Sequence, residues 1–128
     1  MRLLLDTHAF LWWVFADGKL PDRARAAIGD DANEVLVSAV TAWEIATKYR
    51  LGKLPEARVV ADDIAKAIAG ERFGELPLSV RHAQRAGALG GSHRDPFDRM
   101  LIAQALVDDL ALVSNETIFD MYGVRRVW

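Results

Sequence analysis

The chain has no cysteine among its 128 residues, which excludes disulfide bonds and thiolate-bound metal centres. Its three histidines show no spacing typical of metal ligands. No hydrophobic run approaches the length of a membrane span, because the apolar segments 3–5 and 9–16 are both short. We therefore expect a cytoplasmic protein without a secretion signal.

The chain also lacks an excess of basic residues, with 16 Lys and Arg against 18 Asp and Glu and a net charge of −2. This balance does not predict an overall basic surface for nucleic acid, so binding to a polyanion would depend on local basic patches. The hydrophobic fraction of 52% and the charged fraction of 27% are ordinary for a soluble globular protein. The length suits a single core, and we predict one domain over residues 1–128.

Short apolar segments alternate with helical patterns along the whole chain, without an internal repeat. The predicted strands are 2–6, 34–38, 74–78, 110–114 and 124–128. The predicted helices are 7–17, 21–28, 40–51, 55–70, 80–89, 95–108 and 117–122. This alternation predicts an α/β fold in which helices cover both faces of a doubly wound, parallel sheet.

Four acidic residues, Asp6, Glu44, Asp98 and Glu116, each follow the end of an apolar strand or lie near the start of a helix. In an open parallel sheet these points lie along one edge, so the sequence predicts a carboxylate cluster. Several like charges in one place are usually tolerated because they hold a cation, and carboxylates suit Mg²⁺ or Mn²⁺. Metal-dependent phosphodiester chemistry is the leading interpretation.

Two of the acids also have ordinary structural explanations. Asp6 precedes a predicted helix and would serve as its N-cap. Glu44 has Lys48 one turn later, which would form an i,i+4 ion pair on a helix surface. On a helical wheel, however, Glu44 falls inside the apolar arc of its helix, and a carboxylate that faces inward needs a partner.

The other two acids lie in the first turn of predicted helices, where negative charge is favoured. Asp95 and Asp98 flank Pro96 as N-cap and N3, and Ser114 followed by Glu116 repeats that arrangement. We assign Asp95 to capping. Helix capping accounts for each acid singly, but it does not explain why all four converge on one sheet edge.

Four segments carry a resemblance to a known family. They are Leu5-Asp6-Thr7-His8, Trp43-Glu44-Ile45-Ala46 with Leu51-Gly52-Lys53-Leu54, Arg94-Asp95-Pro96-Phe97-Asp98-Arg99 with Leu101-Ile102-Ala103-Gln104-Ala105, and Leu112-Val113-Ser114-Asn115-Glu116. In this order they resemble a PIN domain, and more narrowly the VapC-type ribonuclease toxins of prokaryotic toxin–antitoxin pairs. The resemblance extends over essentially the whole chain.

The resemblance implies a three-layer α/β/α fold with a central parallel sheet of four or five strands. It also implies that Asp6, Glu44, Asp98 and a late acid form a Mg²⁺ site, with Mn²⁺ as an alternative ion. The late acid is more often Asp in this subgroup, whereas Glu116 stands here and has a longer arm. Ser114 would be a polar neighbour of the waters around the ion.

The implied reaction is endonucleolytic hydrolysis of RNA, which leaves a 3′-hydroxyl and a 5′-phosphate. Asp6 and Asp98 are short and lie at the ends of rigid elements, so they are the best direct metal ligands. Glu44 and Glu116 would hold the waters around the ion or a second ion, and one of them would help to deprotonate the attacking water.

Basic residues flank two of the acids, and they would serve a polyanionic substrate. They are Lys48, Arg50, Lys53, Arg94 and Arg99. The segment 9–15 is apolar on every face, so we expect it to leave aromatic surface for a protein partner. The resemblance implies a cognate VapB-type antitoxin that lays a helix in a hydrophobic groove, together with a toxin homodimer.

Other classes of protein use acids at strand ends. A phosphoacceptor receiver domain needs a paired acid at the first strand and a late lysine, whereas Asp6 is unpaired and the last lysine is Lys66. A haloacid-dehalogenase-type phosphatase needs a second Asp at position 8, which is His8. A non-catalytic RNA-binding or interaction module of the same fold remains open as the alternative function.

Overall fold

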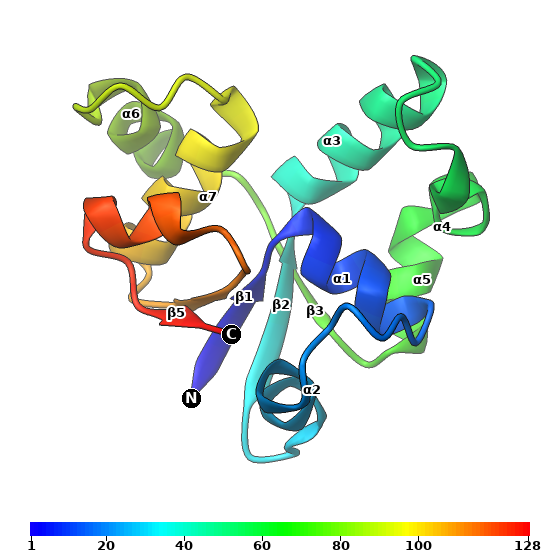
Figure 1. Ribbon diagram of the computed structural model, residues 1–128. Helices are drawn as coiled ribbons and strands as arrows, with labels where there is room; N and C mark the ends of the chain where they lie inside the picture. The colour runs from blue at the N-terminus through cyan, green and yellow to red at the C-terminus, as the bar shows by residue number, and fades with distance from the viewer.

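The computed structural model describes all residues 1–128 and contains one five-stranded sheet in the order β3-β2-β1-β4-β5 (Figure 1). The strands are β1 (Arg2–Leu5), β2 (Glu34–Ser38), β3 (Gly74–Leu76), β4 (Ala111–Val113) and β5 (Arg126–Val127). Every pair of neighbouring strands is parallel. The predicted parallel sheet between helices is therefore confirmed.

The central strand β1 is apolar on both faces because helices cover both sides of the sheet. Leu4 lies beside Leu36 of β2 and Leu112 of β4, and these three side chains pack in the core on one face. Leu3 and Leu5 point the other way and pack in the core on the opposite face. Alternate strand residues thus build two separate hydrophobic cores.

The helices divide into two layers around the sheet (Figure 1). They are α1 (Thr7–Val14), α2 (Asp22–Gly29), α3 (Ala39–Arg50), α4 (Arg58–Asp62), α5 (Ile64–Gly70), α6 (Val80–Ala88), α7 (Pro96–Val107) and the 3₁₀ helices η1 (Pro55–Ala57) and η2 (Thr117–Tyr122). Helices α1, α2, α4 and α5 pack on one face, whereas α7 and η2 pack on the other. Helix α3 joins both cores through Ile45 and Val40.

The prediction of one continuous helix over 55–70 is wrong. The chain forms η1 and α4 and then breaks at Asp63, whose backbone is extended with φ −157°. The carboxylate of Asp63 accepts a hydrogen bond from the backbone N–H of Lys66 at 3.0 Å. Asp63 therefore starts a second helix as an N-cap, a role that aspartate often takes in preference to a helix interior.

The expected aromatic surface on α1 is also mostly absent. The indole of Trp13 donates a hydrogen bond to Glu71 at 3.0 Å, and the rings of Trp12 and Trp128 lie 5.8 Å apart. Both tryptophans are thus partly buried by their own chain, and only Phe15 just beyond the helix is clearly exposed. Glu71 and Trp128, which are distant from α1 in the sequence, cover the aromatic face of this helix.

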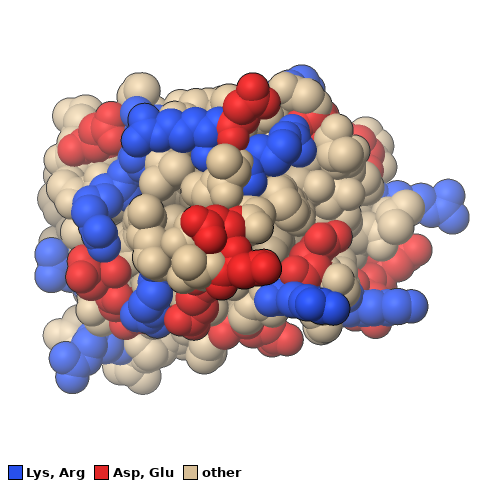
Figure 2. All heavy atoms as spheres, turned by 90° about the horizontal axis from the view of Figure 1, so that it is seen from below, with Lys and Arg blue, Asp and Glu red and all other residues tan.

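The surface carries charge of both signs rather than one continuous basic face. Figure 2 shows the molecule from below, and acidic and basic side chains are interspersed on that face. Because charges of both signs are interspersed, any surface for a polyanion must be local, as the near-neutral composition predicts.

No helix has the length and apolar character needed to cross a membrane.

Candidate active site

The four predicted acids meet at the carboxyl edge of the sheet. The chain passes from β1 to β2 and β3 on one side and returns to β4 and β5 on the other, so the crevice between β1 and β4 is a topological switch point. Asp6 follows β1, Glu44 lies on α3, Asp98 lies on α7 and Glu116 follows β4. Together with Asp95 they line one small cleft of about 50 Å³.

Asp6 is fixed by its position between β1 and α1. One carboxylate oxygen accepts a hydrogen bond from the backbone N–H of Ala9 at 2.8 Å, so the predicted N-cap is present. Asp6 is only 6% exposed. Burial raises its pKa to about 6, although the Ser114 hydroxyl and the Ala9 N–H offset part of the effect. A carboxylate placed at such a cost points to a function beyond capping.

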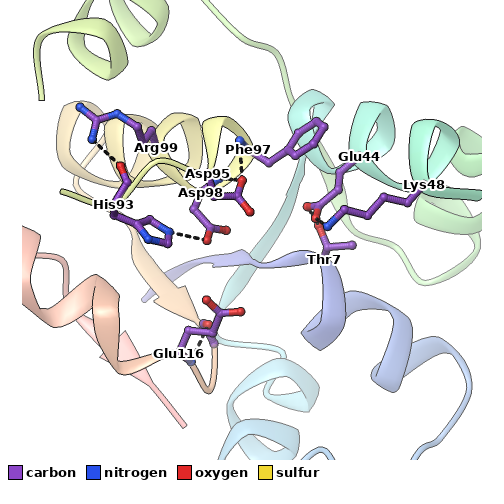
Figure 3. A network of polar contacts seen from close by, with 10 residues as sticks. Thr7, Glu44, Lys48, His93, Asp95, Phe97, Asp98, Arg99 and Glu116 are labelled. Atoms are coloured by element: carbon purple, nitrogen blue, oxygen red, sulfur yellow. Dashed lines mark hydrogen bonds and ion pairs between the residues drawn. The ribbon is translucent and has the colours of Figure 1, made fainter. Parts of the chain in front are cut away.

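Asp98 lies in the first turn of α7 and faces the cleft (Figure 3). Asp95 caps this helix by accepting hydrogen bonds from the N–H groups of Phe97 and Asp98, as expected. The imidazole of His93 lies 2.7 Å from one oxygen of Asp98. Burial raises the pKa of Asp98 to about 6, against the lowering effect of His93, and the charges of Asp95 and Glu116 raise it further.

Glu116 is the freest of the four acids. It is exposed, and no protein group forms a hydrogen bond or ion pair with its carboxylate. Its backbone N–H donates to the hydroxyl of buried Ser114 at 3.0 Å, which holds the turn after β4. Figure 3 shows the carboxylates of Glu116 and Asp98 on opposite sides of the site, pointing toward each other.

Glu44 faces inward, as its place on the helical wheel predicts, and is 6% exposed. Both of its oxygens are engaged. The Thr7 hydroxyl donates to one oxygen at 2.5 Å, and the Lys48 ammonium donates to the other in an i,i+4 ion pair (Figure 3). The inward orientation and the ion pair were competing expectations, and the structure shows both at once.

Lys48 reaches over the acidic cleft from the next turn of α3. Its ammonium lies 5.7 Å from the centre of the Phe97 ring. Partial burial opposes its charge, but the hydrogen bond and charge of Glu44, with the charges of Asp95 and Asp98, hold the pKa of Lys48 above its ordinary value. Lys48 therefore remains a cation, and its charge is stabilised by Asp95 and Asp98 as well as by its direct partner Glu44.

Arg99 does not extend toward solvent, where a polyanion would meet it. Its guanidinium donates to the backbone carbonyls of Leu89, Gly90 and His93 and so fastens the loop that precedes α7. This loop presents His93 to Asp98. Of the basic residues that flank Asp98, Arg99 is thus engaged by its own loop.

A buried pair of polar side chains braces the helices that carry Glu44 and Asp98. The Ser38 hydroxyl, at the end of β2, accepts from the N–H of Val40 at 2.9 Å and donates to Gln104 of α7 at 2.6 Å. The Gln104 amide also donates to the carbonyl of Pro77 at 3.3 Å. Since Ser38 and Gln104 are fully buried, these bonds fix α3 and α7 relative to each other.

The cleft has the donor chemistry of a Mg²⁺ or Mn²⁺ site, because it offers carboxylate oxygens and no sulfur. The acidic and histidine side chains do not yet surround a common point at the spacing of a bound ion. Two acids are instead held by neighbours, Glu44 by Lys48 and Asp98 by His93. The residue types therefore fit the metal, although their present positions are those of a site held by protein partners.

The sequence patterns missed three contributors to the site. Thr7 directly follows Asp6, but its bond to Glu44 spans 37 positions and has no local signature. His93 shows no spacing typical of a metal ligand, although it lies five positions before Asp98. The role of Arg99 as a loop anchor depends on backbone carbonyls, which composition and spacing do not reveal.

Comparisons with known proteins agree with this architecture. The pattern of the PIN domain family matches residues 3–124. Ribonuclease VapC16 of Mycobacterium tuberculosis is 45% identical over 65 residues, which are 51% of this chain and 45% of that protein. The chain therefore spans less than half the length of this relative.

Solved structures share the fold over nearly their whole length. A VapBC2 complex of Rickettsia felis bound to a promoter DNA fragment gives a TM-score of 0.68 at 18% identity and covers 98% of this chain and 97% of the other. VapBC-1 of nontypeable Haemophilus influenzae gives 0.67 at 14% identity, with 98% and 96% covered. FitAcB of Neisseria gonorrhoeae gives 0.65 at 20% identity, with 97% and 95% covered.

Proposed function

We propose that this chain, which belongs to the PIN domain family, is a metal-dependent endoribonuclease that acts as the toxin of a toxin–antitoxin pair. The observation that carries the proposal is the cleft in which Asp6, Glu44, Asp98 and Glu116 meet from four separate elements. The relative named as a ribonuclease and a toxin–antitoxin complex of the same fold from Klebsiella pneumoniae support it.

The proposed reaction is hydrolysis of an RNA phosphodiester bond. Water attacks phosphorus, the bond from phosphorus to the 3′-oxygen breaks, and the products carry a 3′-hydroxyl and a 5′-phosphate. A Mg²⁺ or Mn²⁺ ion bound in the cleft would supply Lewis acidity and would lower the pKa of water. Asp6 and Asp98 are the proposed ligands. Glu116 is the best group to accept the proton of the attacking water, because it is exposed and no protein group holds its carboxylate.

The metal site predicts a difference between two N-cap aspartates. Mn²⁺ should raise the thermal midpoints of the wild type and of the Asp63→Asn variant. It should raise the thermal midpoint of the Asp6→Asn variant much less. Asn preserves each N-cap and removes only the charge. Binding to the native state stabilises it by about 2.7 kcal/mol at a hundredfold excess over Kd. Thermal denaturation with and without Mn²⁺ measures this, and equal responses of all three proteins would reduce Asp6 to a cap.

Cleavage of a mixed RNA pool tests the reaction itself. The wild type should cut RNA with Mg²⁺ or Mn²⁺ and lose this activity with EDTA, and the products should accept 3′-end ligation without prior treatment. A folded protein that binds Mn²⁺ but never cuts RNA would instead favour a non-catalytic RNA-binding or interaction module with the same fold.

The proposed partner is a VapB-type antitoxin, and the surface proposed for it lies between α1, α4 and α5. This groove has a volume of about 400 Å³, and its lining combines four apolar residues (Val14, Val59, Val60 and Ala67) with charged ones (Asp62, Asp63, Lys66 and Glu71). Val59 is 75% exposed, so the chain itself does not cover it. The fold is shared with a chain of a solved toxin–antitoxin complex, and we also propose a toxin homodimer.

A charged substitution in the groove should separate partner binding from catalysis. Val59→Asp is expected to weaken antitoxin binding at least tenfold, because a carboxylate cannot be buried in an apolar contact without a large penalty. Val80→Asp is the matched control, since Val80 is 84% exposed on α6, outside this groove. Calorimetry and RNase assays measure the two properties. Equal antitoxin affinities for both variants would place the interface elsewhere.

A further inference from the structure

Lys48 has an unusual environment for a residue in an i,i+4 helix pair. Such pairs normally lie in solvent, where they contribute little. Here the partner Glu44 has only 8% of its side chain exposed, and the Lys48 side chain is 33% exposed. The other oxygen of Glu44 accepts a hydrogen bond from the Thr7 hydroxyl at 2.5 Å. The ammonium is therefore bound at the wall of the acidic cleft rather than on an open helix surface.

The cleft concentrates negative charge around this one ammonium. Five carboxylates line it, namely Asp6, Glu44, Asp95, Asp98 and Glu116, and Lys48 is the only lysine or arginine among the lining residues. Lys48 also lines the adjoining hollow with Lys53, so it stands between the acids and the surface. The Phe97 ring of α7 lies beside its ammonium, within the range of a cation–π contact.

From this geometry we infer that Lys48 is the resident cation of the site and that a divalent ion binds in competition with it. Without metal, its ammonium neutralises Glu44 and partly screens the other carboxylates. When Mg²⁺ or Mn²⁺ enters, Glu44 is released from Lys48, and the ammonium no longer pairs with the carboxylates of the cleft. The inference rests on the proposed metal site and assigns a new role to Lys48.

This competition has two measurable consequences. Removal of the ammonium withdraws a repulsive charge from the neighbourhood of the ion, so affinity for a divalent cation should rise roughly tenfold or more in a site of intermediate dielectric. Removal also leaves Glu44 buried beside other acids without its counter-charge, so the metal-free protein should become less stable. A helix-surface ion pair would produce neither effect.

The test is calorimetric titration of Mn²⁺ alone into wild type, Lys48→Met, Lys48→Arg and Lys53→Met proteins. Lys53→Met is the control, because Lys53 is exposed, lines the same hollow and pairs with no acid. We expect the roughly tenfold gain in affinity for Lys48→Met only. Lys48→Arg keeps the charge and should bind Mn²⁺ about as the wild type does. Lys48→Gln replaces Lys48→Met if the latter fails to fold.

Thermal denaturation in EDTA gives the second readout. Lys48→Met should melt below Lys53→Met without metal, and saturating Mn²⁺ should close the gap. Equal or weaker Mn²⁺ binding by Lys48→Met relative to Lys53→Met overturns the inference, as does absence of Mn²⁺ binding in all four proteins. If the Mn²⁺ affinities of the four proteins follow the expected order but none of the proteins cleaves RNA, the nuclease proposal is refuted and the competition with Lys48 stands.

Discussion

An Asp98→Asn protein is expected to lose RNA cleavage by at least about 100-fold while it folds normally. Loss of a group that merely supports a metal ligand costs roughly 10- to 100-fold, so loss of a ligand charge should cost at least the upper value. The amide keeps the size of the carboxylate and can still bond to His93, which lies 2.7 Å from Asp98. The structural consequences should therefore be small.

Stability should stay equal or rise in the same variant. Burial raises the pKa of Asp98 to about 6, so the folded protein holds the ionised carboxylate less favourably than the unfolded chain does. Asn removes this unfavourable charge. Urea denaturation and an RNase assay on the same preparation measure both properties. Full activity in a folded Asp98→Asn protein would refute the proposed metal mechanism at this position.

Asp95→Asn is the matched control for this experiment. Asp95 lines the same cleft and caps the same helix through hydrogen bonds to Phe97 and Asp98 at 2.9 and 3.1 Å. Asn is an equally good N-cap, so α7 should keep its start. Most of the activity should survive in Asp95→Asn if Asp95 only caps. The reverse order of activities would show that Asp95, rather than Asp98, holds the ion.

The positions of the acids could be predicted from the sequence because they depend on local patterns. The apolar run of β1 ends directly before Asp6, and the wheel of α3 places Glu44 on its inner face. Parallel strands then bring their carboxyl ends to one edge, whatever the loops between them do. The sheet and the convergence of the acids follow from these rules, which need no knowledge of distant contacts.

The contacts that each side chain makes could not be predicted from local patterns. The hydroxyl of Thr7 meets Glu44 across 37 positions, and no local pattern encodes such a contact. Helical spacing allowed the Lys48 pair but said nothing about its place at the wall of a cleft. Likewise, Trp12 is covered by Trp128 from the far end of the chain. Tertiary packing decides these details.

The metal-free protein is expected to become more stable as the pH falls from 7.5 to 5. Both Asp6 and Asp98 have a pKa raised from 3.8 to about 6 by burial. Between these values the folded state binds more protons than the unfolded state, so the free energy of unfolding decreases as pH rises through this window. A paired surface carboxylate, whose pKa is lowered, would give the opposite slope.

The size of this effect follows from the two shifts. A shift of about two units corresponds to about 3 kcal/mol for one carboxyl, and the pair will give less than twice that value because their titrations are coupled. Urea denaturation of metal-free protein at pH 7.5, 6 and 5 measures it. The double variant Asp6→Asn, Asp98→Asn should be more stable at pH 7.5 and should lose most of the slope. If wild type and double variant show the same slope, these carboxyls do not carry the buried charge, and the site does not need a cation to offset it.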